Sequence, residues 1–488
     1  MSDARPLVEE LVPAPDSFAT CARFAGLPFL VFLDSATDPE QLGRHSFLTA
    51  DPCTAVRSKA LLTQQLVDGR WIRVDGDPLT RVRALLAPYA AEPVAEVPPF
   101  QGGAAGYVGY EWGGTLERLP RARYDDLAIP DVLLGVYDWV IAWDHAAGRA
   151  WVISTGMPER GTAQTERAVR RLEFVKQRLA GSRVAGWTGS NGPTSRLPAY
   201  PPTRPLAPSY PLADVPGVRS NFTRAGYLDA VAHVIEYIFA GDIFQANLSQ
   251  RLEAPLAGTP LGLYGRLRRR NPAPFAAFLE FGDVVVASSS PERFLRVHDG
   301  RRVETRPIKG TRPRGVGPEH DAALALALTE SDKDRAENVM IVDLLRNDLS
   351  RVCRPGTVCV PELFAVEHYA TVHHLVSTVV GELAPEHDAV DLVQAAFPGG
   401  SITGAPKVRA MQIIAELEPT QRAVYCGSIG YLSVTGALDT SIVIRTYLVL
   451  GRDVYFQVGG GIVADSDPEE EYRETLDKAR GLVAALTP

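Results

Sequence analysis

Short apolar runs separated by turn residues dominate the chain from about residue 15 to 155, for example at 29–33, 56–62 and 132–143. Runs of this length and composition are typical of strands, so we predict a β-rich first half. At 159–179 the pattern changes to a helical period, with charged residues on the opposite face.

The stretch 181–217 is rich in Pro, Ser and Gly and lacks an apolar period. This composition is typical of a linker or a long surface crossover. We therefore divide the chain into a β-rich region at 1–182, a linker or crossover at 183–220 and a second folded region at 221–488.

Helices and strands arrive in mixed order in the second region. A helix capped by Thr223 is predicted to stop at Gly241. Further helices are predicted at 332–349, from Pro406 to about 417, and at 469–486, and strands at 284–287, 294–297, 303–306, 441–450 and 454–458. Such an order favours an α+β fold with largely antiparallel sheets.

The bulk composition excludes several function classes. The chain has 488 residues, a net charge of −8 and no basic field that would draw it to nucleic acid or an anionic membrane. No apolar run approaches the roughly 20 residues that span a bilayer, and no leader is visible, so we expect a cytoplasmic protein. Its five cysteines show no metal-binding spacing.

Lysine is scarce, with only six residues, at 59, 176, 309, 333, 407 and 478, among 50 Lys plus Arg. Arginine cannot readily lose a proton, so a retained lysine is a candidate for amine chemistry. Lys309 is one such candidate nucleophile, and Glu292 and His374 are candidate acid/base groups. Taken alone, a lysine is more often exposed to solvent and a histidine is more often a hydrogen-bonded structural residue.

Two predicted helices each carry two carboxylates at i, i+3 spacing: Asp334 with Glu337, and Glu471 with Glu474. Residues at that spacing share one helix face, so the two faces could hold a hard divalent cation, for which magnesium fits best. The alternative is that both faces are solvated.

An arginine and two glycine-rich segments are candidate anion sites. Arg445 lies in an apolar run, 441–448, that predicts a central strand, where its guanidinium needs either a structural carboxylate or a ligand carboxylate. Backbone N–H groups at 398–407, with Pro406 at the first helical position, could bind a carboxylate. So could a glycine turn after a strand, formed by Gly459, Gly460 and Gly461.

Taken together and in order, the segments from about 222 to 486 resemble the chorismate-binding enzyme family. This family includes anthranilate synthase and aminodeoxychorismate synthase large subunits, isochorismate synthases and salicylate synthases. The first region resembles the N-terminal part of the aminating members at 32–35, 44–47, 102–107 and 137–138. The resemblance implies a large two-sheet, mostly antiparallel α/β sandwich with its chorismate-binding catalytic region at 221–488.

The resemblance also implies a set of site residues. Magnesium falls on Glu337 and Glu474, with Asp334 and Glu471 reaching it through water. The substrate contacts fall on Arg445 and Tyr431 at the enolpyruvyl carboxylate, on Thr403, Gly404, Gly459, Gly460, Gly461 and Lys478 at the other charged groups, and on His374 beside the ring.

Two positions indicate the reaction within the family. The water-using members have a lysine base in the strand that here spans 243–248, and this chain has none, so ammonia is the expected nucleophile. Aminodeoxychorismate synthases typically have a lysine at position 309, where anthranilate synthases have alanine. The resemblance thus implies that Lys309 forms a covalent adduct with chorismate, with Glu292 as the acid, to give 4-amino-4-deoxychorismate for p-aminobenzoate and folate synthesis.

Two alternatives stay open: amination at C2, as in anthranilate synthase, and a non-catalytic ligand-sensing subunit. The chain shows no glutaminase cysteine motif, so we expect a separate glutaminase partner to supply ammonia. Some family members carry an N-terminal tryptophan site, and the sequence does not indicate whether this chain binds tryptophan.

Overall fold

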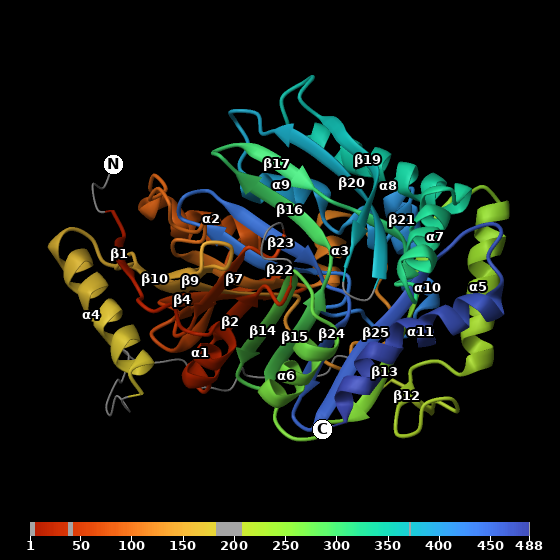
Figure 1. The fold of residues 1–488 in the computed structure, drawn as a ribbon, viewed down its shortest axis with the longest axis horizontal. Coiled ribbons are helices and arrows are strands. Elements are labelled where there is room, and N and C mark those ends of the chain that lie inside the picture. The colour runs from red at the N-terminus through yellow and green to blue at the C-terminus, as the bar shows by residue number, and fades with distance from the viewer. Residues whose placement is uncertain (1–4, 38–41, 182–206, 370–371, 488) are drawn as a thin grey trace.

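The computed structural model describes residues 5–37, 42–181, 207–369 and 372–487. Within these ranges the chain forms two large sheets covered by helices, and neighbouring strands pair antiparallel, as in β13 with β25 and β16 with β23 (Figure 1). The predicted α+β architecture with two mostly antiparallel sheets is confirmed.

The first sheet contains, in spatial order, β1 (Leu7–Glu10), β10 (Arg149–Ser154), β9 (Trp139–Asp144), β3 (His45–Thr49), β2 (Leu30–Asp34), β14 (Phe275–Phe281), β15 (Val284–Ser290), β24 (Thr446–Leu450), β25 (Asp453–Ile462), β13 (Gln245–Pro255), β12 (Arg219–Ser220) and β11 (Tyr210–Pro211), with β21 (Gly404–Ala405) beside β13. The second contains β18 (Ile308–Pro313), β20 (Val372–Glu382), β17 (Arg302–Thr305), β16 (Arg293–His298), β23 (Leu438–Ile442), β22 (Ser428–Ser433), β7 (Gly103–Val108), β8 (Val132–Tyr137), β4 (Thr54–Lys59), β5 (Leu62–Val67) and β6 (Arg70–Val74), with β19 (Cys359–His368) beside β20.

The α-helices are α1 (Ser17–Phe24), α2 (Pro78–Leu86), α3 (Gly113–Leu116), α4 (Thr162–Leu179), α5 (Arg224–Phe239), α6 (Pro260–Arg270), α7 (Pro318–Thr329), α8 (Asp332–Ser350), α9 (Ala389–Ala396), α10 (Lys407–Leu417) and α11 (Pro468–Leu486). Three short 3-10 helices are η1 (Ala87–Tyr89), η2 (Tyr110–Trp112) and η3 (Gly400–Ile402). No helix among the described residues is both long and apolar enough to cross a bilayer.

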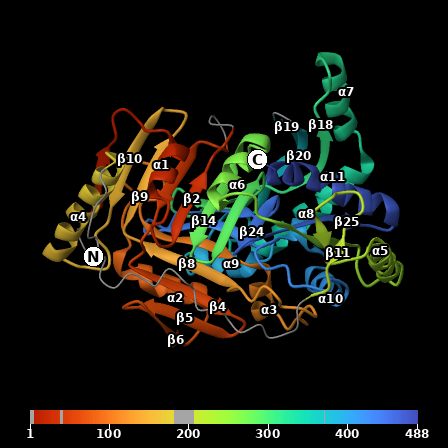
Figure 2. The ribbon, with the colours of Figure 1, turned by 90° about the horizontal axis from the view of Figure 1, so that it is seen from below.

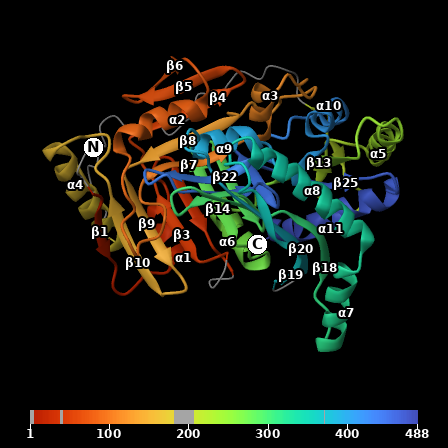
Figure 3. The same ribbon diagram turned by 90° about the horizontal axis from the view of Figure 1, so that it is seen from above.

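The two sheets pack face to face through an apolar layer that includes Val31 and Leu279 of the first sheet and Tyr107 and Ile429 of the second. The outer face of the first sheet is covered by α1, α4, α6 and α11, and that of the second by α2, α8 and α9. Figures 2 and 3 show this helix–sheet–sheet–helix order from two sides, with α7 projecting from the body.

The regions 1–182 and 221–488 both contribute strands to both sheets. For example, β2 of the first region pairs with β14 of the last, and β7 pairs with β22. Of the segment 183–220, residues 183–206 lie outside the described residues, and the remainder forms β11 and β12 at the edge of the first sheet. One body is therefore built from both ends of the chain.

Polar caps start the helices that carry the predicted site residues. The Thr223 side chain accepts a hydrogen bond from Gly226 N, as predicted for α5. Ser331 caps α8 by accepting from Asp334 N, and Asp467 caps α11. These local contacts satisfy N–H groups that a helix start leaves without partners, and they fix where the acidic faces of α8 and α11 begin.

Candidate active site

The chain crosses between the two sheets at two neighbouring points. β15 of the first sheet passes into β16 of the second through Glu292, and β23 of the second passes back into β24 of the first through Arg445. Ile442 N donates to Glu292 O at 3.0 Å and Ser289 N donates to Arg445 O at 3.1 Å. The two crossings are therefore tied to one another by main-chain hydrogen bonds.

The prediction of one continuous strand through Arg445 is wrong. Arg445 has a φ of +50°, so its backbone leaves the extended conformation between β23 and β24. Its side chain does not share the alternation of Val443 and Tyr447. The chain stays apolar on both sides of the point where it changes from one sheet to the other. The hydrophobic pattern alone therefore does not show where the strand is interrupted.

Glu292 is a buried acid with a side chain that is 4% exposed. Burial raises the pKa of its carboxyl to about 7, opposed by a hydrogen bond from the Ser401 hydroxyl and by the nearby Lys309. Ile308 N also donates to Glu292 Oε1 at 3.5 Å. A carboxyl with this pKa is partly protonated near neutral pH and can donate a proton to a leaving group.

Arg445 has a guanidinium that is available to an anionic ligand. Burial lowers its pKa, while the Glu292 carboxylate opposes the shift. In the part of the chain that the structure describes, no carboxylate forms an ion pair with it. A buried guanidinium without a protein counter-charge is costly, and a ligand carboxylate would supply the missing charge.

Lys309 occupies a bulge in β18. Ile308 pairs with Val376 and Thr311 pairs with His374, so β18 spends one more residue than β20 over this interval. Gly310 takes a φ of +90° within the bulge, a conformation that favours glycine. The bulge sets the direction of the Lys309 side chain independently of the strand alternation.

The Lys309 amine lies in the interior, close to the first sheet. A Cβ atom built on Gly461 of β25 would lie 3.6 Å from Lys309 Nζ and 2.0 Å from Gln245 Nε2. Burial lowers the pKa of Lys309, and the carboxylates of Glu337 and Glu292 oppose the shift. Among the described residues the amine has no hydrogen-bond or ion-pair partner, so it is free to act as a base or nucleophile.

His374 is held as a neutral imidazole. Its Nδ1 lies 2.8 Å from Thr311 Oγ1, and Tyr369 packs edge-on against its ring. Burial, reinforced by Arg445, lowers its pKa to about 3. At neutral pH it can therefore exchange hydrogen bonds with a ligand, but it carries no proton to donate as an imidazolium.

The predicted carboxylates face the same space, with Glu471 buried and the Glu474 side chain half exposed. A Cβ on Gly460 would lie 3.0 Å from Glu471 Oε2 and 3.4 Å from Glu474 Oε1, and a Cβ on Gly310 would lie 3.0 Å from Asp334 Oδ1. The carboxylate of Glu337, on α8, is close enough to Lys309 to raise the pKa of its amine. α8 and α11 thus direct their acidic faces toward the Lys309 amine.

These carboxylates have the chemistry of a magnesium site, although no three His, Cys, Asp or Glu side chains of the described residues converge on one point. Glu474 pairs with Lys478 at 2.5 Å and Asp334 with Arg312 at 2.8 Å. Glu471 Oε2 is buried without a hydrogen-bond partner. A buried anionic oxygen without a donor is costly, and a hard cation would satisfy it.

The glycine-rich segments differ from their predicted conformations. Gly459, Gly460 and Gly461 lie within β25, paired with β13, rather than in a turn after a strand. Glycine fits these positions because atoms of β13 and α11 occupy the space that a Cβ would need. Lys478 of α11 donates to Gly459 O of β25 at 2.9 Å.

The loop before α10 is closed on itself. Pro406 is the N-cap of α10 rather than its first residue. The Thr403 hydroxyl donates to Gly399 O at 3.0 Å, within the loop. Gly404 approaches β13 so closely that a Cβ would lie 2.1 Å from Gln245 O. Thr403 and Gly404 therefore fix the loop against the strand that carries Gln245.

The structure does not bring Tyr431 to this cluster. Its ring stacks on Phe100 and contacts Phe47, and it lines a separate cavity of about 260 Å³ between the two halves of the chain. Arg445 lies beyond the other end of the adjacent strand β23. The site residues that the sequence reasoning did not select are Ser401 and Gln245, and both lie in segments it had singled out.

Residues 35–484 match the family model described as chorismate binding enzyme. The chain belongs to the chorismate-binding enzyme family. It is an enzyme that acts on chorismate, and the predicted family is confirmed.

Individual members differ in the reaction their names give. The chain is 42% identical over 464 residues to aminodeoxychorismate synthase component 1 of Salmonella typhimurium, covering 94% of this chain and 93% of the relative. It is also 42% identical over 419 residues to anthranilate synthase component 1 of Thermus thermophilus, covering 84% and 82%. Overall identity therefore does not choose between the two reactions.

The fold of a chorismate-binding enzyme is found in solved structures as well. Anthranilate synthase component I from Streptococcus pneumoniae superposes with a TM-score of 0.73 at 32% identity, covering 90% of this chain and 92% of that one. The two-sheet arrangement is thus that of an established architecture.

Proposed function

We propose that this chain is the synthase subunit of an aminodeoxychorismate synthase, which converts chorismate and ammonia into 4-amino-4-deoxychorismate with Lys309 as a covalent nucleophile. The observation that carries the proposal is the Lys309 amine, which has a pKa lowered by burial and no partner among the described residues. Lowering this pKa raises the share of neutral amine, which is the form that attacks carbon.

The proposed reaction has two bond-exchange steps. First, Lys309 Nζ bonds to ring C2 while the C4–O bond breaks, and the departing hydroxyl takes the proton of Glu292 and leaves as water. Ammonia then bonds to C4 as the C2–N bond to Lys309 breaks. The new ammonium group returns one proton to the Glu292 carboxylate, so the net change is hydroxyl for amine with release of water.

Arg445 is the proposed anchor of the enolpyruvyl carboxylate, because its guanidinium lies beside Glu292 without an ion-pair partner among the described residues. Magnesium would be held by Glu337 and Glu474, with Asp334 and Glu471 close by. When bound it supplies positive charge that neutralises and orients the ring carboxylate. Glu474 and Asp334 would exchange their cationic partners for the ion.

The proposed partner is a glutaminase subunit that supplies ammonia, in keeping with the component 1 names of the relatives. The product would be a precursor of p-aminobenzoate and folate. The second candidate is amination at C2 to give anthranilate, and the identity to the Thermus thermophilus enzyme supports it.

The experiment that tests the proposal is identification of the product. Purified protein is incubated with chorismate, magnesium and ammonium, and products are separated and identified by mass and ultraviolet spectrum, with a chelator control for the metal. We expect 4-amino-4-deoxychorismate. Anthranilate as the main product would refute the proposal and establish the second candidate.

A further inference from the structure

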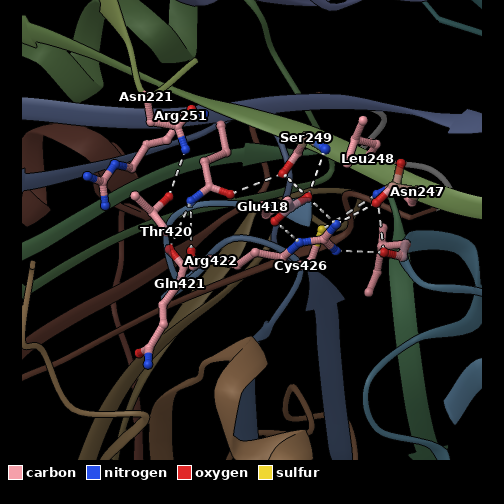
Figure 4. Close-up of polar contacts among 12 residues, drawn as sticks. Asn221, Asn247, Leu248, Ser249, Arg251, Glu418, Thr420, Gln421, Arg422 and Cys426 are labelled. Atoms are coloured by element: carbon pink, nitrogen blue, oxygen red, sulfur yellow. Dashed lines mark hydrogen bonds and ion pairs between the residues drawn. The ribbon is translucent and has the colours of Figure 1, made fainter. Parts of the chain in front are cut away.

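Arg422 and Glu418 form an ion pair in the interior of the molecule (Figure 4). The side chains are 1% and 3% exposed. Arg422 Nε donates to Glu418 Oε2 at 2.9 Å and Nη2 donates to Oε1 at 2.7 Å. Both charges are thus paired in bidentate geometry.

The remaining donors of Arg422 reach two main-chain carbonyls. Nη1 donates to Ile402 O at 3.0 Å, at the end of η3, and Nη2 donates to Asn247 O at 2.5 Å, on β13. Asn247 N in turn donates to Thr403 O at 2.8 Å. Arg422 therefore clamps the loop before α10 onto the strand that carries Gln245.

Glu418 binds the same strand two residues further along, at Ser249. Its Oε1 accepts from both Ser249 N and Ser249 Oγ at 2.8 Å. The pair thus holds β13 at Asn247 and Ser249 and holds the loop at Ile402 (Figure 4).

The conformation of the loop before α10 explains why a charged side chain is suited to hold it. Thr403 has φ −111° and ψ −82°, and Gly404 has φ +148°, so the loop departs from the strand conformation. Ile402 O accepts from side chains instead, from Arg422 Nη1 at 3.0 Å and Asn247 Nδ2 at 3.1 Å. A guanidinium offers several donors in fixed directions and can satisfy such carbonyls. Stability alone does not require it, because apolar replacements of buried ion pairs are often neutral.

Each of the two clamped segments carries a residue that neighbours one of the reacting groups. η3 carries Ser401, whose hydroxyl donates to the Glu292 acid. β13 carries Gln245, which lies with Lys309 above Gly461. Movement of η3 relative to β13 would displace Ser401 from Glu292 or Gln245 from the Lys309 amine, and so would alter the surroundings that hold each reacting group in place.

We propose that the Glu418–Arg422 pair positions the proton donor Glu292 relative to the Lys309 amine by clamping η3 to β13. The two residues are positioning residues, since neither contacts the reacting groups. The inference rests on the proposed function in taking Lys309 as the nucleophile and Glu292 as the acid.

The test compares Arg422→Lys and Glu418→Gln with a matched control, Arg171→Lys. Arg171 is equally buried and binds Asp51 and Asp138 in the N-terminal half, away from the site. We expect kcat of chorismate consumption with ammonium to fall about 10- to 100-fold in Arg422→Lys, because small misplacements of reacting groups are costly. The KM for chorismate should change little, since Arg445 is not moved.

The pH–rate profile separates positioning from simple destabilisation. If η3 shifts, Ser401 no longer lowers the pKa of Glu292, and the loss of activity at high pH moves upward in both site variants. Arg171→Lys should lower Tm without changing kcat or the profile. An unmoved profile with kcat within about threefold of wild type in Glu418→Gln, which keeps the shape of the pair, would overturn the inference.

The readout is consumption of chorismate, whichever product forms. If the wild-type protein makes anthranilate, the proposed function fails, but the effect of the clamp on Glu292 is still measured by the profile. If the wild type makes 4-amino-4-deoxychorismate and the variants match the control, only the positioning inference fails.

Discussion

Glu292 and Arg445 lie at two neighbouring crossings between the two sheets, on chain segments that run in opposite directions. The acid precedes a strand of the second sheet, and the arginine precedes a strand of the first. Because main-chain hydrogen bonds join the two crossings, a carboxylate held by Arg445 lies at a fixed place relative to the Glu292 proton. The proposed leaving-group chemistry depends on this arrangement.

Activity should fall as pH rises through about 7, the pKa of Glu292. The acid works in its protonated form, so the loss follows its deprotonation. Ser401→Ala removes the hydrogen bond that lowers this pKa, so the falling limb should move to higher pH. A hydrogen bond worth about 1 kcal/mol corresponds to roughly 0.7 pH unit.

The measurement is kcat against pH for wild type, Ser401→Ala and Ser350→Ala. Ser350 is a matched serine on α8 whose hydroxyl donates to Arg346 O, and its loss should leave the profile in place. Movement of the Ser401→Ala limb to lower pH would contradict the assignment of that limb to Glu292.

Lys309→Ala should reduce formation of 4-amino-4-deoxychorismate by at least about 100-fold, because the neighbouring amine, that of Lys478, is paired with Glu474 and does not replace the nucleophile. Intact-protein mass spectrometry after incubation with chorismate without ammonia should show an adduct of chorismate minus water on wild type and none on the variant. Lys176→Ala on α4, which removes a surface lysine paired with Glu9, should behave as wild type. Full activity in Lys309→Ala would rule out covalent catalysis by this residue.

Local signals in the sequence predict much of the site. The acidic faces of α8 and α11 could be predicted from the i, i+3 spacing of the carboxylates and from the side-chain caps. These features involve residues only a few positions apart in the sequence. The predicted helix at 332–349 accordingly differs from α8 by one residue at its end. The positions of α8 and α11 relative to each other come from tertiary packing, which spacing does not encode.

Non-local register explains what the sequence did not predict. The bulge that directs Lys309 arises from pairing with β20, more than sixty residues later in the chain. The break at Arg445 arises because β23 and β24 join different sheets. Tyr431 was assigned by resemblance alone, and its register against Ala105 directs it to a different cavity. One-residue shifts in register reverse the face of a side chain, and sequence pattern does not fix them here.

Glu337→Gln and Glu474→Gln should each raise the magnesium concentration needed for half-maximal activity by about tenfold or more, because each removes one anionic oxygen ligand. Asp343→Asn on α8 and Asp477→Asn on α11 are matched controls, since both carboxylates pair with exposed arginines on their own helix. Magnesium titrations followed by activity and by thermal shift measure the effect. An unchanged requirement in both site variants would place the metal elsewhere.

Gly461→Ala should disable the site without unfolding the protein. The added Cβ would lie 2.0 Å from Gln245 Nε2 and 3.6 Å from Lys309 Nζ, so Gln245 must move from its place beside the amine. We expect kcat to fall about 10- to 100-fold, as for other small displacements of reacting groups. Gly481→Ala on α11 is the matched control, because a Cβ there meets no atom within 4 Å and alanine favours helix, so its Tm should hold or rise. Wild-type kcat in Gly461→Ala would show that the contact between β25 and Gln245 does not hold the reaction centre.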